Sequence, residues 1–281
     1  QLAAFKQGMR ELGYIEGQNY VIEYRNGKGN IERLHEVAAE LVRLKVDVIL
    51  TSPGKNPTLA AQRATSTIPI VMPGSRVDPV EAGYVVSLAR PGGNITGLAD
   101  LRAELYGKRL ELLKEALPRI SRVTMLWNQG QLERWGKVIK AQAQALGIEL
   151  QSVVVHRSAI ETNLSEISRK TQGLSVTAAG GASVQHRARI VDFAMKRRLP
   201  AIYDRSRFVD AGGLMSYGTD ILDLYRQAAT YVGKILKGAK PADLPIERPK
   251  KFELAINLKA AKQLGVTIPP ILLLQATKVI K

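Results

Sequence analysis

The chain has 281 residues, 45% hydrophobic and 23% charged, which is typical of globular proteins and argues against disorder. The absence of cysteine excludes disulfides, thiolate nucleophiles and thiolate metal ligands. The formal net charge is +16, but the basic residues are spread along the chain. Their densest run, 196–198, ends a predicted helix, where cations suit the helix dipole, so the charge indicates a solvated surface and no nucleic-acid partner.

The chain shows neither a membrane-spanning segment nor a visible export signal. No apolar run approaches the roughly 18 residues needed to cross a bilayer. The opening residues, QLAAFKQGMRELG, already have a helical pattern, and no basic segment precedes an apolar one.

Helices and short buried strands alternate through the first hundred residues. Asn30 is expected to cap one helix, and Asn56-Pro57 to begin the next with Pro57 at the first helical position. Strands are predicted at 46–51 and 68–72, because their apolar runs alternate little, as in strands buried on both faces. A polar loop, a short helix and a Gly-Gly-Asn turn at 92–94 then lead into another strand.

The alternation continues through the rest of the chain. Helices are predicted at 104–117, in a segment ending at 146, and at 160–171, 184–198 and 220–236. Strands are predicted at 123–127, 148–155, 174–179, 200–203, 214–217 and 252–256. Residues 237–251 form a predicted linker, and two short helices around Pro269-Pro270 close the chain.

This order of elements predicts an α/β fold with two doubly wound parallel-sheet lobes. More than ten elements are too many for one core, so we expect the chain to cross between the lobes three times. The predicted N-terminal lobe is 1–97 plus 216–250, and the C-terminal lobe is 98–215 plus 251–281. Such lobes leave a ligand cleft lined by strand ends and helix N-termini, which closes by a hinge.

The usual catalytic and cofactor motifs do not occur in the sequence. The histidines, His35, His156 and His186, lie in separate segments without a metal-type cluster. No G-x-S-x-G, H-E-x-x-H, P-loop or G-x-G-x-x-G motif is present. An α/β chain without a nucleophile elbow or a cofactor fingerprint favours a binding protein that is no enzyme and has no cofactor or metal.

Polar residues follow two predicted strands of the first lobe. Those after the first strand lead into a helix N-terminus, which makes an anion site or a plain capped turn. Asp78, after the second strand, is also a good N-cap before Pro79. The candidate ligand-binding residues in this lobe are Thr51, Ser52, Gly54, Lys55, Asn56, Gly74, Ser75, Arg76 and Asp78.

Equivalent positions follow the strands of the second lobe. The candidates there are Gln129, Gly180, Gly181, Tyr203, Asp204 and Tyr217. We expect a solute carboxylate to meet the loop 51–56, with Lys55 or Arg76 adding charge, and an ammonium group to pair with Asp78. Tyr203 and Tyr217 are predicted to offer stacking surfaces, although the ring of Tyr217 could simply pack.

Several segments of the sequence, which together cover most of the chain in order, resemble a known protein family. They resemble the solute-binding components of bacterial ABC uptake systems, in the branch labelled tryptophan/tyrosine transport substrate-binding proteins. The matching segments are FKQGMRELGYIEGQNYVIEYR, AAELVRLKVDVIL, ATSTIPIVM, DPVEAGYVVSLARPGGNITGL, KRLELLKEALP, LPAIYDRSRFVDAGGLMSYG, YRQAATYVGKILKGAKPADLPIERPKKFELAINLKAAKQLG and IPPILL.

The resemblance implies a periplasmic type I binding-protein fold, a small-molecule ligand held between two lobes, and delivery to the membrane permease of an ABC transporter. It further implies a periplasmic, exported and monomeric protein. Similar proteins open with one more strand before the first helix, whereas this chain begins at that helix.

Three loops depart from the family pattern. Arg76-Val77 replaces a small residue before Asp78-Pro79-Val80, and 180–183 replaces an Asp-Pro with aromatic residues. The loop 128–132 is shortened. All three fall at pocket positions implied by the resemblance, so the ligand stays open between an amino acid and an aromatic or organic acid.

Two other function classes compete with transport. An effector-sensing domain of the same fold needs a DNA-binding helix-turn-helix if it acts as a repressor, and neither end of this chain supplies one. An enzyme that uses Asp78 with a histidine has no supporting spacing.

Overall fold

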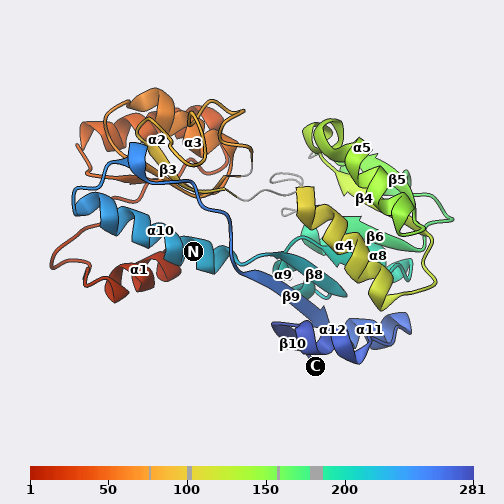
Figure 1. Cartoon of the computed structure of the whole chain (residues 1–281). Coiled ribbons are helices and arrows are strands. Elements are labelled where there is room, and N and C mark those ends of the chain that lie inside the picture. The colour runs from red at the N-terminus through yellow and green to blue at the C-terminus, as the bar shows by residue number, and fades with distance from the viewer. Residues whose placement is uncertain (76, 100–102, 157–158, 178–185) are drawn as a thin grey trace. The chain divides into compact units, whose positions relative to one another are not determined.

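The computed structural model describes residues 1–281 except 76, 100–102, 157–158 and 178–185. The chain forms two compact units, which are described separately. Unit 1 comprises Gln1–Leu101 and Asp220–Lys251, and unit 2 comprises Arg102–Thr219 and Phe252–Lys281. These bounds mean that the chain passes from one unit to the other three times (Figure 1).

Unit 1 contains a three-stranded parallel sheet in the order β1-β2-β3. The strands are β1 (Ile49–Leu50), β2 (Ile70–Ser75) and β3 (Ile95–Ala99). Every residue of β2 and β3 is buried, as expected of strands that are covered on both faces. The first strand is shorter than the predicted 46–51, because only two of its residues pair with β2.

Two helices of unit 1 come from opposite ends of its sequence and lie side by side (Figure 1). They are α1 (Leu2–Glu11) and α10 (Ile221–Leu236). A Cβ atom placed on Gly8 of α1 would lie 2.8 Å from the Ala229 Cβ of α10, so this glycine permits the close approach. Met9, Val71 and Leu98 belong to the core under these helices.

The other helices of unit 1 are α2 (Ile31–Arg43), α3 (Lys55–Ala64) and the 3₁₀ turn η1 (Pro241–Asp243). The predicted cap of α2 is confirmed, since the Asn30 side chain accepts a hydrogen bond from Arg33 N. Helix α3 begins at Lys55, two residues before the predicted first position at Pro57. Proline is tolerated there because the first helical turn leaves its N–H groups without intrahelical partners.

Two further segments of unit 1 differ from the prediction. Residues 79–83 form a hydrogen-bonded turn instead of a short helix, with Ala82 N donating to Asp78 O. The predicted linker 237–251 contains η1, and its later part runs beside β3, where Glu247 bridges to Leu98. Backbone pairing therefore fixes much of a segment whose composition alone indicates a loose linker.

Unit 2 contains a seven-stranded sheet in the order β10-β9-β8-β7-β6-β4-β5. One neighbouring pair, β8 with β9, is antiparallel, whereas the sequence predicts parallel pairing throughout. The reason is that β8 ends where the chain leaves unit 2, and β9 begins where it returns. The strands are β4 (Arg122–Trp127), β5 (Glu149–Val154), β6 (Gly173–Val176), β7 (Ala201–Tyr203), β8 (Met215–Thr219), β9 (Phe252–Asn257) and β10 (Lys278–Ile280).

Helices flank this sheet in unit 2. They are α4 (Ala103–Ala116), α5 (Gln129–Ala145), α6 (Ile160–Ser165), α8 (Arg187–Lys196), α9 (Ser206–Asp210), α11 (Leu258–Leu264) and α12 (Pro270–Gln275). Helix α6 ends six residues before the predicted 171, and α9 is an additional short helix. Among the described residues, no helix is long and apolar enough to cross a membrane.

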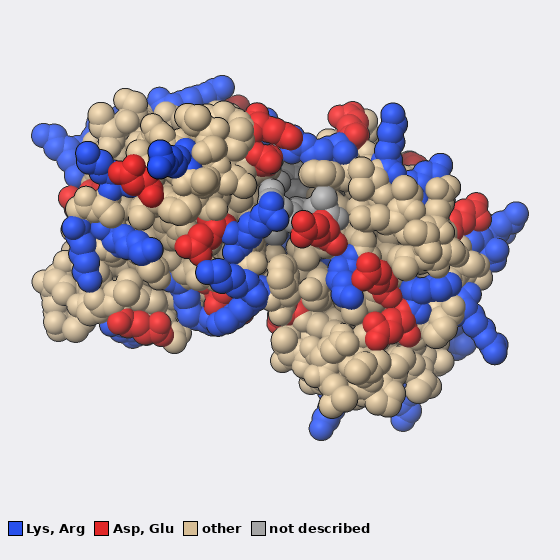
Figure 2. All heavy atoms as spheres, in the orientation of Figure 1, with Lys and Arg blue, Asp and Glu red and all other residues tan. Residues whose placement is uncertain are grey.

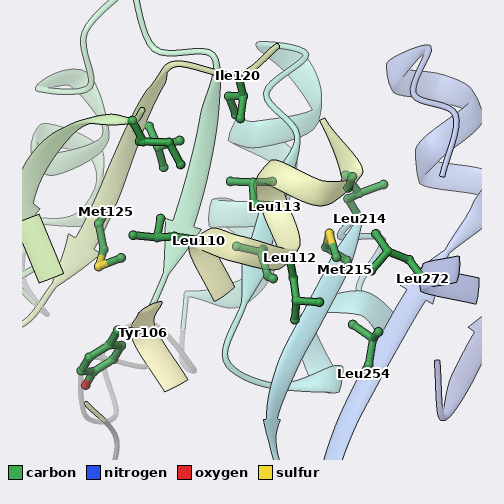
Figure 3. Close-up of a cluster of buried hydrophobic side chains, with 14 of the residues drawn as sticks. Tyr106, Leu110, Leu112, Leu113, Ile120, Met125, Leu214, Met215, Leu254 and Leu272 are labelled. Atoms are coloured by element: carbon green, nitrogen blue, oxygen red, sulfur yellow. The ribbon is translucent and has the colours of Figure 1, made fainter. Parts of the chain in front are cut away.

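The sheet of unit 2 separates two apolar clusters. One contains residues of α4 together with β4, β8 and β9, and Figure 3 shows Leu110, Leu113, Met125 and Met215 within it. The other contains Tyr203 and Phe208 with residues of α6 and α8. Burial on both faces accounts for the apolar runs of the central strands. Lys and Arg side chains are scattered over the visible faces with acidic residues among them, and form no single stripe (Figure 2).

We predict that Gly97→Ala strongly destabilises the protein. Gly97 has φ +126°, and an added Cβ would lie 2.6 Å from Met72 N and overlap Met72 O. The free energy of unfolding in urea should fall by about 3 kcal/mol. Gly93→Ala is the matched control, because a Cβ there meets nothing within 4 Å. Equal urea concentrations at the midpoint of unfolding for the two variants would contradict the prediction.

Candidate functional site

The candidate residues of unit 1 lie at the carboxyl ends of β1 and β2. Thr51 is buried, and its N donates a hydrogen bond to Val71 O, so it continues the pairing of the two strands. Ser52, Lys55 and Asn56 are exposed. These residues therefore combine a fixed backbone with accessible polar side chains.

The N-terminus of α3 offers backbone donors at this edge. Its N-cap is Gly54, with φ +142°, and no side chain caps the helix. The first N–H groups of a helix have no intrahelical acceptor, and the helix dipole favours negative charge there. This end of α3 can therefore accept an anion, as the sequence predicts, although the geometry alone also suits a plain turn.

The turn after β2 is tied to the same helix. Tyr84 Oη donates to Lys55 O at 2.9 Å, and Gln62 Nε2 donates to Gly83 O at 2.8 Å. The structure thus brings together the two polar loops of unit 1 that the sequence singled out.

Asp78 has the capping role that its sequence context predicts. Its Oδ1 accepts hydrogen bonds from Val80 N at 2.8 Å and from Glu81 N at 3.2 Å. Ser75 is buried and donates to Val77 O at 2.6 Å, and Gly74 is buried in β2. Arg76, between them, lies outside the described residues. A carboxylate anchored through one oxygen can still pair with a cation through the other.

Gln129 and Gln131 of unit 2 have opposite surroundings. Gln129 is exposed, and its Nε2 donates to Glu133 Oε1 along the outside of α5. Gln131 forms a capping box with Asn128, in which each side chain accepts a hydrogen bond from the backbone N of the other. Gln131, which the sequence analysis missed, is therefore the glutamine that binds other side chains at the end of β4.

Tyr203 lies in the core, and so it does not offer the predicted stacking surface. Its side chain is completely buried and stacks on Phe208 with ring centroids 4.7 Å apart. Burial raises the pKa of the Tyr203 hydroxyl well above its usual range. Gly180 and Gly181 belong to the segment 178–185, outside the described residues.

Asp204 and Tyr217 lie at the strand-end edge of β7 and β8. Asp204 is buried directly after β7. Tyr217 is half-buried in β8 and stacks on Phe252 with centroids 5.9 Å apart. A Cβ on Gly218 would overlap Asp204 O, so β8 passes close to this residue. Tyr217 keeps part of its ring accessible, in contrast to Tyr203.

A buried arginine that sequence reasoning missed also reaches this edge. Arg109 of α4 is 3% exposed, and its Nε donates to Tyr217 O at 2.7 Å. Its guanidinium carbon lies 5.5 Å from the centre of the Tyr106 ring. The signal was available, because Arg109 directly precedes Leu110 within the apolar stripe of a helix, where a charged residue is unusual.

A continuous chain of polar contacts extends from Arg109 toward β6. Gln131 Nε2 donates to Tyr106 Oη at 3.0 Å. Thr177, directly after β6, donates to Leu126 O at 2.7 Å and lies 3.1 Å from Gln131 Oε1. We call Tyr106, Arg109, Gln131 and Thr177 the strand-end network. Tyr106, Arg109 and Thr177 are buried and Gln131 is half-buried, so the network orders polar groups beneath the strand ends.

Among the described residues, these edges hold no metal-type constellation. Within the described parts of the chain, no group of three or more His, Asp or Glu residues could hold a metal ion. The chemistry available is hydrogen bonding, charge pairing and ring contact, which suits recognition of a small polar solute.

Comparison with known proteins agrees with this geometry. A curated relative, the tyrosine-binding protein of Clostridioides difficile strain R20291, is 26% identical over 273 residues, covering 93% of this chain and 75% of the relative. A domain protein from Vibrio cholerae is 29% identical, with a TM-score of 0.86 and coverage of 99% and 95%. An ABC domain from Streptococcus pneumonia in complex with L-Trp is 26% identical, with a TM-score of 0.87 and coverage of 99% and 93%.

More distant structures share the fold alone. A ribose operon repressor from Lactobacillus acidophilus is 14% identical, with a TM-score of 0.59, and covers 88% of this chain. The fold is therefore that of the type I periplasmic binding proteins, as the sequence predicts. The model of the ABC transporter substrate binding protein family matches residues 2–280, and so the chain belongs to this family of solute-binding proteins.

Proposed function

We propose that this protein binds a small carboxylate-bearing solute, an amino acid or an aromatic or organic acid, and delivers it to the permease of an ABC transporter. The observation that carries the proposal is the family match over residues 2–280. The named ligands of two relatives, tyrosine and L-Trp, support a carboxylate as the common group. Proteins of this family act outside the cytoplasm, and we propose an exported, periplasmic and monomeric protein that has no enzymatic activity and binds no nucleic acid.

The site chemistry supports this proposal in both units. In unit 1, the open N-terminus of α3 and the exposed Lys55 suit a carboxylate, and Asp78 suits an ammonium group. In unit 2, the strand-end network orders the polar groups at this edge, and the half-buried Tyr217 supplies a ring surface. Closure of the lobes on the solute stays a prediction, which small-angle scattering with and without solute tests.

The first prediction about the proposed function concerns the class of ligand. Isothermal titration with aromatic amino acids, aliphatic amino acids and aromatic carboxylates should give binding heat for at least one class, because each carries the proposed common group. Native mass spectrometry of the purified protein provides an independent measurement. No heat from any class, with protein shown to be folded by circular dichroism, would contradict the proposed function.

A second prediction isolates the charge of Asp78. Asp78→Asn keeps a side-chain oxygen that can cap the turn at Val80 and Glu81, but it removes the negative charge. Affinity for ammonium-bearing solutes should fall about tenfold or more, and affinity for ammonium-free carboxylates should not fall. For this comparison, the parent protein and Asp78→Asn must unfold at the same temperature. Equal loss for both solute types would count against ammonium recognition by Asp78.

A third prediction uses the two glutamines of α5. Gln131→Leu removes the contacts to Tyr106 and Thr177, so solute affinity should fall about tenfold through loss of the ordered network. Gln129→Leu is the matched control, because Gln129 bonds only to Glu133 on the helix surface among the described residues. Calorimetry on both variants measures the difference, and equal affinities would exclude the network from solute binding.

A further inference from the structure

Arg205 is a largely buried cation at the strand-end edge of unit 2. It follows Asp204 at the end of β7 and immediately precedes α9. Its side chain is 16% exposed. Tyr203 before it and Phe208 after it are buried, so packing fixes the backbone on both sides of Arg205.

Among the residues that the structure describes, the guanidinium of Arg205 has fewer partners than such burial normally requires. Its Nε lies 3.8 Å from Asp204 Oδ2, which is too long for a hydrogen bond, and a guanidinium has five N–H donors. Over the described ranges, it makes no other ion pair and donates no hydrogen bond. Burial, and then the like charge of Arg207, lower the pKa of Arg205 to about 10.

This arrangement costs stability unless an anion completes it. A desolvated charge without good hydrogen bonds is unfavourable, because its lost hydration is not replaced. The side-chain atoms of the described residues that are fully enclosed and make no hydrogen bond include Tyr203 Oη, Ser175 Oγ and Ser216 Oγ, but no nitrogen of Arg205. A small anion can therefore reach them from solvent.

The charges near this edge also favour an anion. Arg109, Arg205 and Arg207 contribute three positive charges at the ends of β7 and β8. Acidic groups near this edge include Asp204 and the half-buried Glu253, whose residue pairs with Gly218 across β8 and β9, whereas Asp210 at the end of α9 is paired with Lys278. Arginine is suited to carboxylates, because its planar fork matches two oxygens.

We propose that Arg205 binds a carboxylate of the solute, and that the preferred solutes are net anions whose acidic groups outnumber their ammonium groups. This inference rests on the proposed function and narrows its solute class. It assigns specificity to a residue that follows the strand-end motif Tyr203-Asp204 and was not among the candidates from the sequence.

The test compares solutes that differ by one ammonium group. The pairs are L-tyrosine with 3-(4-hydroxyphenyl)propanoate, and L-leucine with 4-methylpentanoate, titrated calorimetrically at one ionic strength. In a pair that binds, the acid should bind more tightly than the zwitterion. Arg205→Gln should lower the affinity for the acid about tenfold or more, as expected for loss of charge-assisted hydrogen bonds.

Arg189→Gln is the control variant, because it removes one positive charge from an exposed position of unit 2 whose ion pair with Glu161 is 3.5 Å long. It should change affinity less than twofold. Without solute, Arg205→Gln should unfold at a temperature no lower than that of the parent protein, because it loses no well-formed ion pair.

The outcomes separate this inference from the function on which it rests. Binding of the zwitterions with equal or weaker binding of the acids would overturn the anion preference and leave solute binding intact. A lower unfolding temperature for Arg205→Gln with unchanged affinity would make Arg205 a structural residue. No heat from either pair or from the wider set of amino acids and carboxylates would overturn the proposed function as well.

Discussion

The path of the chain out of unit 2 and back into it depends on the antiparallel pairing of β8 with β9. Residues 215–219 pair with 252–256, and the last pair, Thr219 with Phe252, stands at the two ends of the segment that belongs to unit 1. That segment is closed within unit 1 as well, since Asp220 N donates to Lys251 O. The pairing joins β9 and β10 to the sheet of unit 2. It also holds β8 where Tyr217 can accept the hydrogen bond of the buried Arg109.

Most of the fold is predictable from the sequence, because burial on both faces leaves a strong apolar signal. The runs at 123–127 and 200–203 become central strands, and the capped stripe after Asn30 becomes α2. The direction of β9 is not predictable in this way. A strand has the same apolar pattern whichever way it runs, and only the return path of the chain sets its direction. The structure of the predicted linker is not predictable either, because backbone pairing such as that of Leu98 with Glu247 does not depend on composition.

The candidate site is predictable in its location more than in its side chains. Strand-end loops are identified from where apolar runs stop, which correctly leads to Asp78, Asp204 and Tyr217 as residues of those loops. The direction in which a side chain points at a strand end depends on local capping contacts, so the sequence does not distinguish the outward Gln129 from the inward Gln131. Tyr203 shows the complementary error. A tyrosine at the last position of a strand fits either face, and stacking on Phe208 assigns its ring to the core.

Buried polar groups in unit 2 separate into two kinds, and the difference bears on function. Gln131 and Thr177 are tied into contacts that fix their positions, so they contribute order at the strand ends. Arg205 is largely buried, with a carboxylate oxygen 3.8 Å away and a second arginine nearby, and among the described residues no hydrogen bond compensates its charge. A fold optimised for stability alone gains from an apolar residue at such a position. Retaining a guanidinium there is reasonable if a bound carboxylate supplies the missing acceptors, because the interaction that stabilises the residue then also selects the solute.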